Sequence, residues 1–197
     1  MQAHSAGMHL QRFEIAEAIK ETLPEQIHVI YYKSQGTLPG KTENEYLLGM
    51  GAVPHVVTEH GNKFYVDWEE GQKTGFFLDQ RENRKLLGEM SKDKTVLNTF
   101  CYTGGFSVAA LAGGASKVVS ADISNTAINL ANENVALMKL KKGQTHEGIA
   151  VDVMKSLSED TEQFDIVVLD PPAFAKSLSK KHKAVMGYKR LNAMGIN

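Results

Sequence analysis

The stretch VLNTFCYTGGFSVAALAGGASKVVSADIS, residues 96–124, predicts a strand, a glycine turn, a helix, a second strand and a terminal acid, in that order. The adjacent glycines Gly104 and Gly105 let the backbone approach a ligand closely and leave N–H groups available where the helix begins. Asp122 ends the second strand, where a carboxylate can accept from two ribose hydroxyls. This order of elements is typical of a nucleotide-binding βαβ unit.

The glycine turn differs from the dinucleotide fingerprint. Dinucleotide binding requires G-x-G-x-x-G around a pyrophosphate, whereas this turn has the pattern T-G-G-F. A ligand with an adenosine end and no phosphate fits better, and S-adenosylmethionine (SAM) is the common one. Asp152, after the third expected strand, adds a carboxylate that could accept from the adenine amino group. The alternative for these residues is a plain tight turn with an aspartate that caps a helix.

The second half of the chain predicts a parallel sheet. Strands of continuous apolar character are expected at residues 96–100, 118–121, 148–151 and 166–169, separated by helical stretches. Parallel strands have this character because helices cover both faces of their sheet. We therefore expect an α/β, Rossmann-like domain over residues 92–197.

Residues 1–91 predict a small α+β domain with a β-hairpin. A helix is expected where apolar residues recur at helical spacing, at Leu10, Phe13, Ala16, Ile19 and Leu23. Residues 27–32 predict a strand and residues 33–45 a loop. Two further strands flank His60-Gly61-Asn62, which predicts the hairpin. The segment EEGQKTGFFLDQRENRKLL, residues 69–87, predicts a turn and then a helix.

The loop after the fourth expected strand, in FDIVVLDPPAFAKS at residues 164–177, is the candidate substrate-facing segment. Ligands of open α/β sheets bind at the carboxyl ends of strands, where Asp170 is expected. Pro171 and Pro172 fix φ and stiffen the loop. Asp170 could then bond the edge of a nucleobase while Phe174 offers a flat face. The alternative is a strand end followed by a proline stop.

Composition limits the class of protein. The net charge of −1 gives no global basic field, so contact with a polyanion has to be local, as in KSLSKKHK at residues 176–183. One cysteine excludes an internal disulfide framework, and the scattered histidines do not predict a metal site. No apolar run is long enough to span a bilayer, and the start of the chain lacks the layout of a signal peptide. We expect a cytoplasmic protein without membrane contact.

Four strings together resemble the bacterial class I methyltransferases that modify large-subunit ribosomal RNA, and within them the branch that methylates C5 of a cytosine in 23S rRNA. The strings are FCYTGGFSVAALAGGASKVVSADIS at 100–124, DPPAFAKS at 170–177, GYKRLN at 187–192 and GQKTGFFLDQRENR at 71–84. The resemblance covers nearly the whole chain and implies SAM as cofactor and 23S rRNA as substrate.

The resemblance also implies residue roles. The turn after the first strand would hold the methionine part of SAM, the acid after the second strand its ribose, and the acid after the third strand its adenine. A preceding segment would close over the cofactor, and the loop after the fourth strand would face the target base. The methionine part would lie at Asn98, Phe100, Tyr102, Thr103, Gly104, Gly105 and Phe106, the ribose at Asp122, Ile123 and Ser124, and the adenine at Asp152 and Val153. The closing segment would supply Phe77, Asp79 and Arg81. The residues that face the base would be Asp170, Pro171, Pro172 and Phe174, with Asp170 also near the cofactor.

Two departures from the family pattern bear on the chemistry. Family members begin with an RNA-binding PUA domain and continue beyond GYKRLN to a cysteine motif, so we expect this chain to be an incomplete, catalytically impaired fragment. Cytosine C5 methylation needs a thiolate that adds at C6. The single cysteine, Cys101, lies in the cofactor turn where relatives have serine, and we expect it to be a packing residue. With strand order 3-2-1-4, the fourth strand becomes an open edge, which predicts self-association or a homodimer.

The sequence therefore predicts a SAM-dependent rRNA methyltransferase core of the cytosine-C5 branch. One alternative is a methyltransferase for another base position, such as guanine N7, which needs no thiolate. The other is a non-catalytic fragment that binds cofactor, RNA or a partner chain.

Overall fold

The computed structural model describes residues 1–40, 42–72, 74–159, 162–175 and 181–196. By their internal contacts these residues form two compact units. The first comprises Met1–Val57 and Tyr65–Leu78, and the second Thr58–Phe64 and Asp79–Asn197. This division lies earlier in the chain than the expected domain boundary at 91/92, because the helix before residue 91 packs within the second unit. The extent of independently folding domains stays a prediction.

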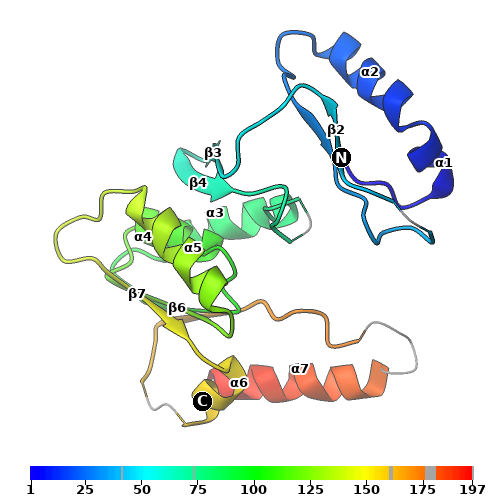
Figure 1. Cartoon of the computed structure of the whole chain (residues 1–197). Coiled ribbons are helices and arrows are strands. Elements are labelled where there is room, and N and C mark those ends of the chain that lie inside the picture. Colours follow the sequence, from blue (N-terminus) through cyan, green and yellow to red (C-terminus); the bar gives the residue numbers. More distant parts are fainter. Residues whose placement is uncertain (41, 73, 160–161, 176–180, 197) are drawn as a thin grey trace. The chain divides into compact units, whose positions relative to one another are not determined.

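The first unit pairs two short helices with a two-stranded antiparallel sheet (Figure 1). Its elements are α1 (Ala6–Leu10), α2 (Arg12–Thr22), β1 (Ile30–Tyr32) and β2 (Glu45–Leu48). The expected helix is interrupted at Gln11, which caps both α1 and α2. Leu10, which lies before this joint, and Phe13, which lies after it, are 72% and 52% exposed, whereas Ala16 is buried. Strand β2 begins at the end of the segment expected to be a loop.

The expected hairpin is confirmed. Strands β3 (His55–Glu59) and β4 (Asn62–Val66) pair with each other. His60 and Gly61 have φ angles of 48° and 83°. Two successive positive φ angles define the tight turn whose twist matches that of a hairpin. Phe64 and Val66 are buried, as their alternation with polar neighbours predicts.

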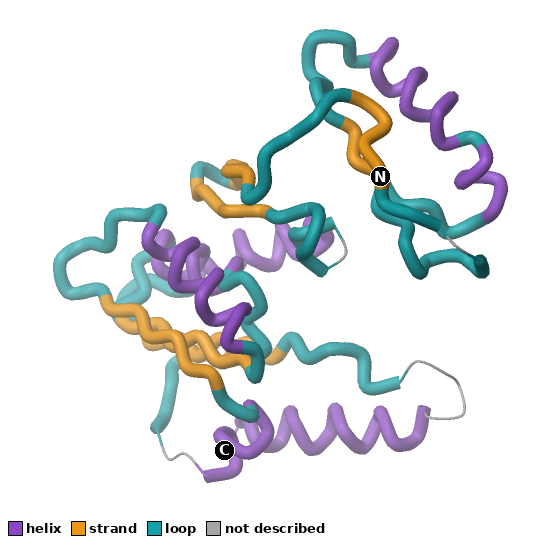
Figure 2. Tube along the Cα trace, viewed as in Figure 1, coloured by secondary structure: helices purple, strands orange, loops and turns teal. Residues whose placement is uncertain are grey.

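The second unit is built on a four-stranded parallel sheet in the order β7-β6-β5-β8. Figure 2 shows its strands in orange. The strands are β5 (Thr95–Thr99), β6 (Lys117–Asp122), β7 (Thr145–Ala150) and β8 (Ile166–Leu169). Thr99 pairs with Ala121 of β6 and with Leu169 of β8, so the carboxyl ends of these strands are level. The α/β class and the strand order 3-2-1-4 are confirmed.

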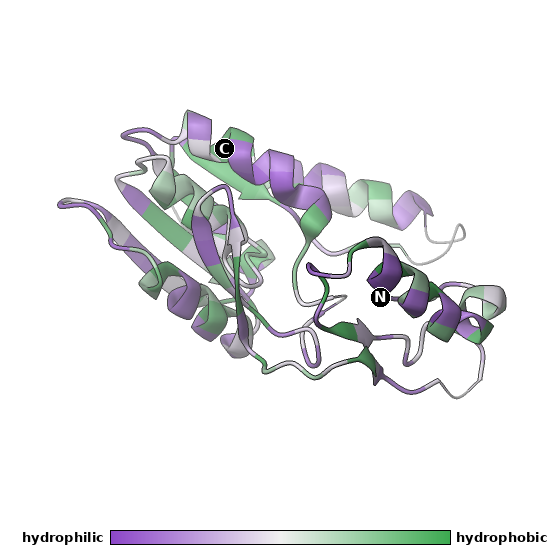
Figure 3. Cartoon of the chain, turned by 90° about the horizontal axis from the view of Figure 1, so that it is seen from above, coloured by the Kyte–Doolittle hydropathy of each residue, from purple (hydrophilic) through white to green (hydrophobic). Residues whose placement is uncertain are grey.

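Helices cover both faces of this sheet (Figures 1 and 2). Helices α4 (Gly105–Ala112) and α5 (Asn125–Ala136) lie on one face, and α6 (Val153–Glu159) and α7 (Lys181–Ile196) on the other. Helix α4 is apolar and mostly buried, whereas α7 carries hydrophilic stretches along much of its length (Figure 3). Among the described residues, no helix is both long and apolar enough to cross a membrane.

A close helix crossing fixes α3 (Arg81–Met90), which follows the short 3-10 helix η1 (Leu78–Gln80), against α4. A Cβ atom added to Gly113 would lie 1.9 Å from the carbonyl oxygen of Gly88. A Cβ atom added to Gly88 would lie 3.1 Å from the carbonyl oxygen of Ala109. Glycine at both positions lets the two backbones touch, which sets where the side chains of α3 meet the start of α4.

Candidate functional site

The parallel sheet brings the expected site segments to one edge. The glycine turn follows β5, and Asp122, Asp152 and Asp170 lie at or just after the ends of β6, β7 and β8. These strands are neighbours, and their carboxyl ends point the same way. In open α/β sheets this edge is where ligands bind. The structure therefore groups the three predicted acids with the glycine turn.

The turn after β5 has a strained backbone. Phe100, Tyr102 and Gly104 have φ angles of 53°, 47° and 73°. The left-handed conformation costs a non-glycine residue about 1–2 kcal/mol. Tyr102 is held there by its N–H, which donates to Asp122 Oδ2 at 3.0 Å, and Cys101 N–H donates to a carbonyl of β6. Such over-determined strain concentrates at ligand-binding turns.

Helix α5 packs directly under the same turn. A Cβ atom added to Gly104 would lie 2.8 Å from the Cβ of Ala131 and meet a backbone already at positive φ. The buried side chain of Asn134 donates to the carbonyl of Thr103 at 2.8 Å. Gly104 is therefore required for two reasons, its conformation and its clearance. Phe106 follows in the first turn of α4.

Asn98 is buried, and of its two side-chain amide atoms only the nitrogen forms a hydrogen bond to a described residue. Its Nδ2 donates to Ser107 Oγ at 2.8 Å, while its buried Oδ1 has no hydrogen-bond partner among the residues that the structure describes. Ser107 Oγ is 2.6 Å from Ser120 Oγ, which is 2.9 Å from His146 Nε2. Burial lowers the pKa of His146. A buried oxygen without a donor is uncommon in native proteins and calls for an explanation, such as a bound group that donates to it.

Asp122 holds two backbone segments at once. Its Oδ2 accepts from Tyr102 N–H and its Oδ1 from Ser124 N–H, each at 3.0 Å. Ser124 caps α5 by accepting from Ala127 N–H. Ile123 between them is 74% exposed, an unusual position for a large apolar side chain. The structure thus gives Asp122 a turn-shaping role that the sequence does not reveal.

Asp152 begins α6. Its Oδ1 accepts from Lys155 N–H at 3.2 Å, which is the geometry of a helix cap. Val153 is buried, so its side chain contributes to packing. Capping uses one carboxylate oxygen, and the other oxygen can still accept from a ligand.

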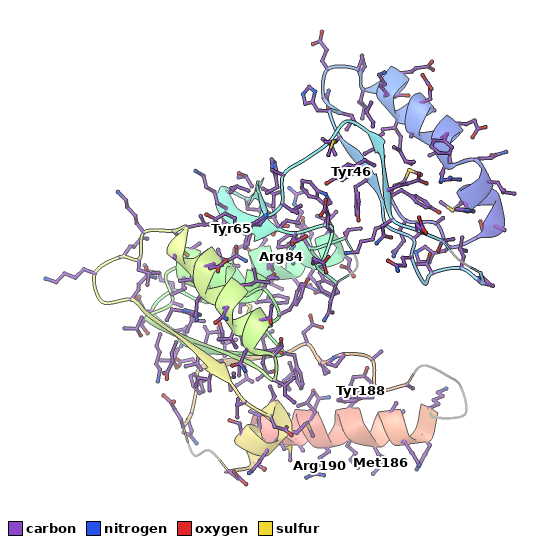
Figure 4. All side chains as sticks on the ribbon, viewed as in Figure 1. Tyr46, Tyr65, Arg84, Met186, Tyr188 and Arg190 are labelled. Atoms are coloured by element: carbon purple, nitrogen blue, oxygen red, sulfur yellow. The ribbon has the colours of Figure 1, made fainter. Side chains whose placement is uncertain are left out.

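The loop after β8 is anchored on α7. The ring centroids of Phe174 and Tyr188 are 4.6 Å apart, and a Cβ atom added to Gly187 would lie 3.0 Å from the Phe174 ring. Tyr188 projects from α7 toward this loop, whereas Met186 and Arg190 project from the opposite side (Figure 4). One part of the Phe174 ring is therefore covered by the protein. Pro171 and Pro172 lie between Asp170 and this anchor.

The segment expected to close over the cofactor spans both units. Phe77 belongs to the first unit, whereas Asp79 in η1 and Arg81 at the start of α3 belong to the second. Arg81 Nε lies 3.3 Å from His60 Nε2 in the hairpin turn. A role for these residues at the cofactor stays a prediction.

A shallow hollow lies on α2 in the first unit, lined by Phe13, Glu14, Glu17, Ala18 and Glu21. It contains none of the predicted site residues, and its wall is rich in carboxylates. We assign it no role, because the chemistry of the chain gathers at the sheet edge.

Cys101 packs against Ile128 and Ala131 of α5. Burial, and next the carboxylate of Asp122, raise the pKa of the thiol to about 12. The folded protein therefore keeps this proton at a pH where the unfolded chain has lost it. Stability from Cys101 is fully present below pH 9.0, its ordinary pKa, and is lost as the pH rises toward 12.

We expect the free energy of unfolding of the wild type to fall by about 1 kcal/mol more than that of Cys101→Ala between about pH 9 and about pH 10. Urea denaturation at both pH values measures the difference. Parallel losses in the two proteins would contradict the raised pKa.

Several site residues escaped the sequence analysis. Ser107, Ser120 and His146 form a chain of contacts that begins at Asn98. The two serines are polar side chains in apolar stretches, whereas His146 lies in the polar first half of strand β7 and has no such signal. Glu59 and Arg84 form a buried ion pair, although 25 residues separate them in sequence. Residues on different elements become neighbours only through the fold.

The fold and the site define a class of protein. A parallel sheet in the order 3-2-1-4, with a glycine turn after its first strand and acids after the next three, is the Rossmann-like arrangement of SAM-dependent methyltransferases. The family model described as S-adenosylmethionine-dependent methyltransferase matches residues 29–192. The chain belongs to this family.

Its relatives act on ribosomal RNA by name. It is 40% identical over 204 residues to ribosomal RNA large subunit methyltransferase I of an Enterobacter species, covering 100% of the chain and 51% of the relative. The protein of the same name from Tolumonas auensis is 39% identical over 203 residues, covering 98% and 50%. The chain spans about half the length of the curated relatives it matches.

Two solved structures have the same fold. A Streptococcus mutans protein described as a SAM-dependent methyltransferase has a TM-score of 0.81 and 29% identity, covering 99% of this chain and 50% of that one. A second methyltransferase, SMU.776, was solved with the demethylated cofactor S-adenosylhomocysteine (SAH) and has a TM-score of 0.77 and 28% identity, covering 96% and 51%.

The residues present fit SAM, the cofactor of this family. The orphan oxygen of Asn98 suits the ammonium of the methionine end, which needs an acceptor. The N–H groups at the start of α4 suit the methionine carboxylate. The carboxylate of Asp122 suits ribose hydroxyls, which need acceptors, and the exposed Ile123 beside it suits an apolar adenine face.

Proposed function

We propose that this chain forms the cofactor-binding and base-facing part of an enzyme that methylates ribosomal RNA. The observation that carries the proposal is that Asp122, Asp152 and Asp170 lie at or just after strand ends on the sheet edge that also holds the strained turn, which follows Asn98 and its orphan acceptor. SAM, when bound, supplies the electrophilic methyl group. The protein then has to orient that group and a nucleobase, since proximity and alignment lower the barrier of a two-reactant step.

Each residue has a task in that orientation. Asn98 Oδ1 accepts from the methionine ammonium, and Asp122 accepts from the ribose hydroxyls while it clamps the turn at Tyr102. Asp152 accepts from the adenine amino group. Asp170 bonds the edge of the target base, and Phe174, braced by Tyr188, provides a rigid face beside it. The two prolines before Phe174 limit the freedom of this loop.

Helix α7 supports RNA as the substrate. It carries four exposed cations and no acidic residue: Lys181, Lys183, Lys189 and Arg190. Residues 176–180, the remainder of the predicted basic segment, lie outside the described residues. Cations next to exposed aromatic rings are the usual means of binding single-stranded nucleic acid. The local charge thus matches a polyanion although the whole chain has a net charge of −1.

We propose C5 of a cytosine in 23S rRNA as the target, by similarity to the relatives. That chemistry needs a thiolate, and Cys101, the single cysteine of this sequence, is buried with a raised pKa. The nucleophile for a cytosine target would thus have to come from outside these residues. The second candidate is a base position such as guanine N7, which needs no thiolate. A cytoplasmic location and self-association through the β8 edge stay predictions.

Two measurements test the function. Calorimetric titration of this chain with SAH is expected to show one binding site, and a lack of binding would contradict the proposal. The full-length gene product is expected to transfer a tritiated methyl group from SAM to ribosomal RNA. Nucleoside analysis of the labelled RNA then distinguishes 5-methylcytosine from 7-methylguanine.

A further inference from the structure

A buried ion pair joins Glu59 of the hairpin to Arg84 of α3. Arg84, which is labelled in Figure 4, donates from Nε to Glu59 Oε1 and from Nη2 to Oε2, both at 2.7 Å. The two side chains are 4% and 10% exposed. Two parallel bonds fix the plane of the guanidinium as well as its position. Desolvation of both charges offsets much of their attraction, so stability alone is a weak reason for such a pair.

The pair lies against the glycine turn. A Cβ atom added to Gly105 would be 3.1 Å from Arg84 Cδ and 3.8 Å from its Nε. Gly105 is the first residue of α4, and the crossing of Gly88 and Gly113 holds α3 against that helix. Arg84 therefore packs directly on the backbone where the cofactor turn becomes a helix.

Charge explains why Arg84 needs Glu59. The start of a helix carries a partial positive charge, so a lone cation beside it is unfavourable. Glu59 neutralises the guanidinium in a bidentate geometry. The start of α4 therefore packs against an Arg84–Glu59 pair that is rigid and close to neutral. The N–H groups at the start of α4 keep their attraction for an anion.

We propose that Arg84 and Glu59 are positioning residues for the cofactor: they fix the place of the Gly104-Gly105 turn and leave the start of α4 able to bind the methionine carboxylate. This inference rests on the proposed function of the turn. Neither side chain is assigned a contact with the cofactor, so their effect reaches it through the backbone of Gly105.

The test compares stability with cofactor affinity. Arg84→Met leaves the Glu59 carboxylate buried without its cationic partner and is expected to lower Tm strongly. The double variant Glu59→Leu/Arg84→Met removes both charges, which is often neutral for stability, so its Tm is expected to return toward the wild-type value. Its Kd for SAH is nevertheless expected to rise about tenfold or more, because small misplacements of a binding turn are costly. If the pair only stabilised the fold, a double variant with a Tm near the wild-type value would also have the wild-type Kd for SAH.

The Arg12–Glu45 pair in the first unit provides the control. Its Nε–Oε1 distance is also 2.7 Å, and it is distant in sequence from the turn. Glu45→Leu/Arg12→Met is expected to leave the Kd for SAH unchanged. Should the double variant at Glu59 and Arg84 not fold, Arg84→Lys keeps the cation without the bidentate geometry and is expected to raise the Kd in a folded protein.

The outcomes are distinct. A folded variant at Glu59 and Arg84 that binds SAH as the wild type does would overturn this inference and leave the proposed function standing. A wild-type protein that does not bind SAH would overturn both. An equal loss of affinity in the Arg12–Glu45 control would also overturn the inference, because the effect would then not belong to the turn.

Discussion

Asp122→Asn is expected to weaken SAH binding by about 10-fold to about 100-fold, since a hydrogen bond to a charged group contributes about 1.5–3 kcal/mol and the variant removes one of the two acceptors proposed for the ribose. Asparagine has nearly the shape of aspartate, but one of its two acceptor oxygens becomes a donor. In the folded protein Asp122 also accepts from Tyr102 N–H and from Ser124 N–H, one at each oxygen. The variant therefore loses a ribose acceptor and releases one end of the strained turn.

Isothermal titration of the variant and the wild type measures this effect. Asp165→Asn is the matched control, because Asp165 also accepts from a backbone N–H, that of Thr95 at 2.8 Å. It directly precedes β8 and so lies at the amino edge of the sheet, opposite the proposed site. Asp165→Asn is expected to cost some stability and to leave SAH affinity unchanged. If both variants bound SAH equally well, Asp122 would not contact the ribose.

Gly113→Ala is expected to destabilise the second unit by about 3 kcal/mol, the upper part of the range for overpacked sites. The added Cβ would lie 1.9 Å from the carbonyl oxygen of Gly88 and 2.8 Å from its Cα. These are backbone atoms, so no side chain can rotate away, and α3 has to move from α4. The movement would also displace Arg84 from Gly105.

Urea denaturation followed by far-UV circular dichroism measures the loss, while fluorescence of Trp68, the single tryptophan, reports the first unit separately. Gly88→Ala, with a closest approach of 3.1 Å, is expected to cost less. Gly7→Ala has nothing within 4 Å of the added Cβ and is expected to be nearly neutral. The same midpoint for Gly113→Ala and Gly7→Ala would contradict the close crossing of α3 and α4.

The sheet was predictable because each of its strands contains an apolar run, which can be recognised from neighbouring residues alone. Four apolar runs separated by helical stretches indicate parallel strands, and each expected strand overlaps the observed one within a few residues. The hairpin was predictable because His60-Gly61 suits a tight turn and Phe64 alternates with polar neighbours. Strand β2 was missed because four residues after a loop give little periodicity. The break at Gln11 was not predicted, because neither proline nor glycine stands there, and it leaves Leu10 in α1 while the later apolar residues lie in α2 or cap it.

The sequence by itself determined the class of the protein: the order of its elements, the strand ends where three acids lie, and the family whose motifs it carries. Only the tertiary structure decided how those residues are held. The left-handed turn clamped by Asp122, the unsatisfied oxygen of Asn98 and the contact of Arg84 with Gly105 depend on side chains from different elements. The physical reason is that periodicity and turn chemistry act over a few neighbouring residues, whereas packing joins residues that the chain itself keeps far apart.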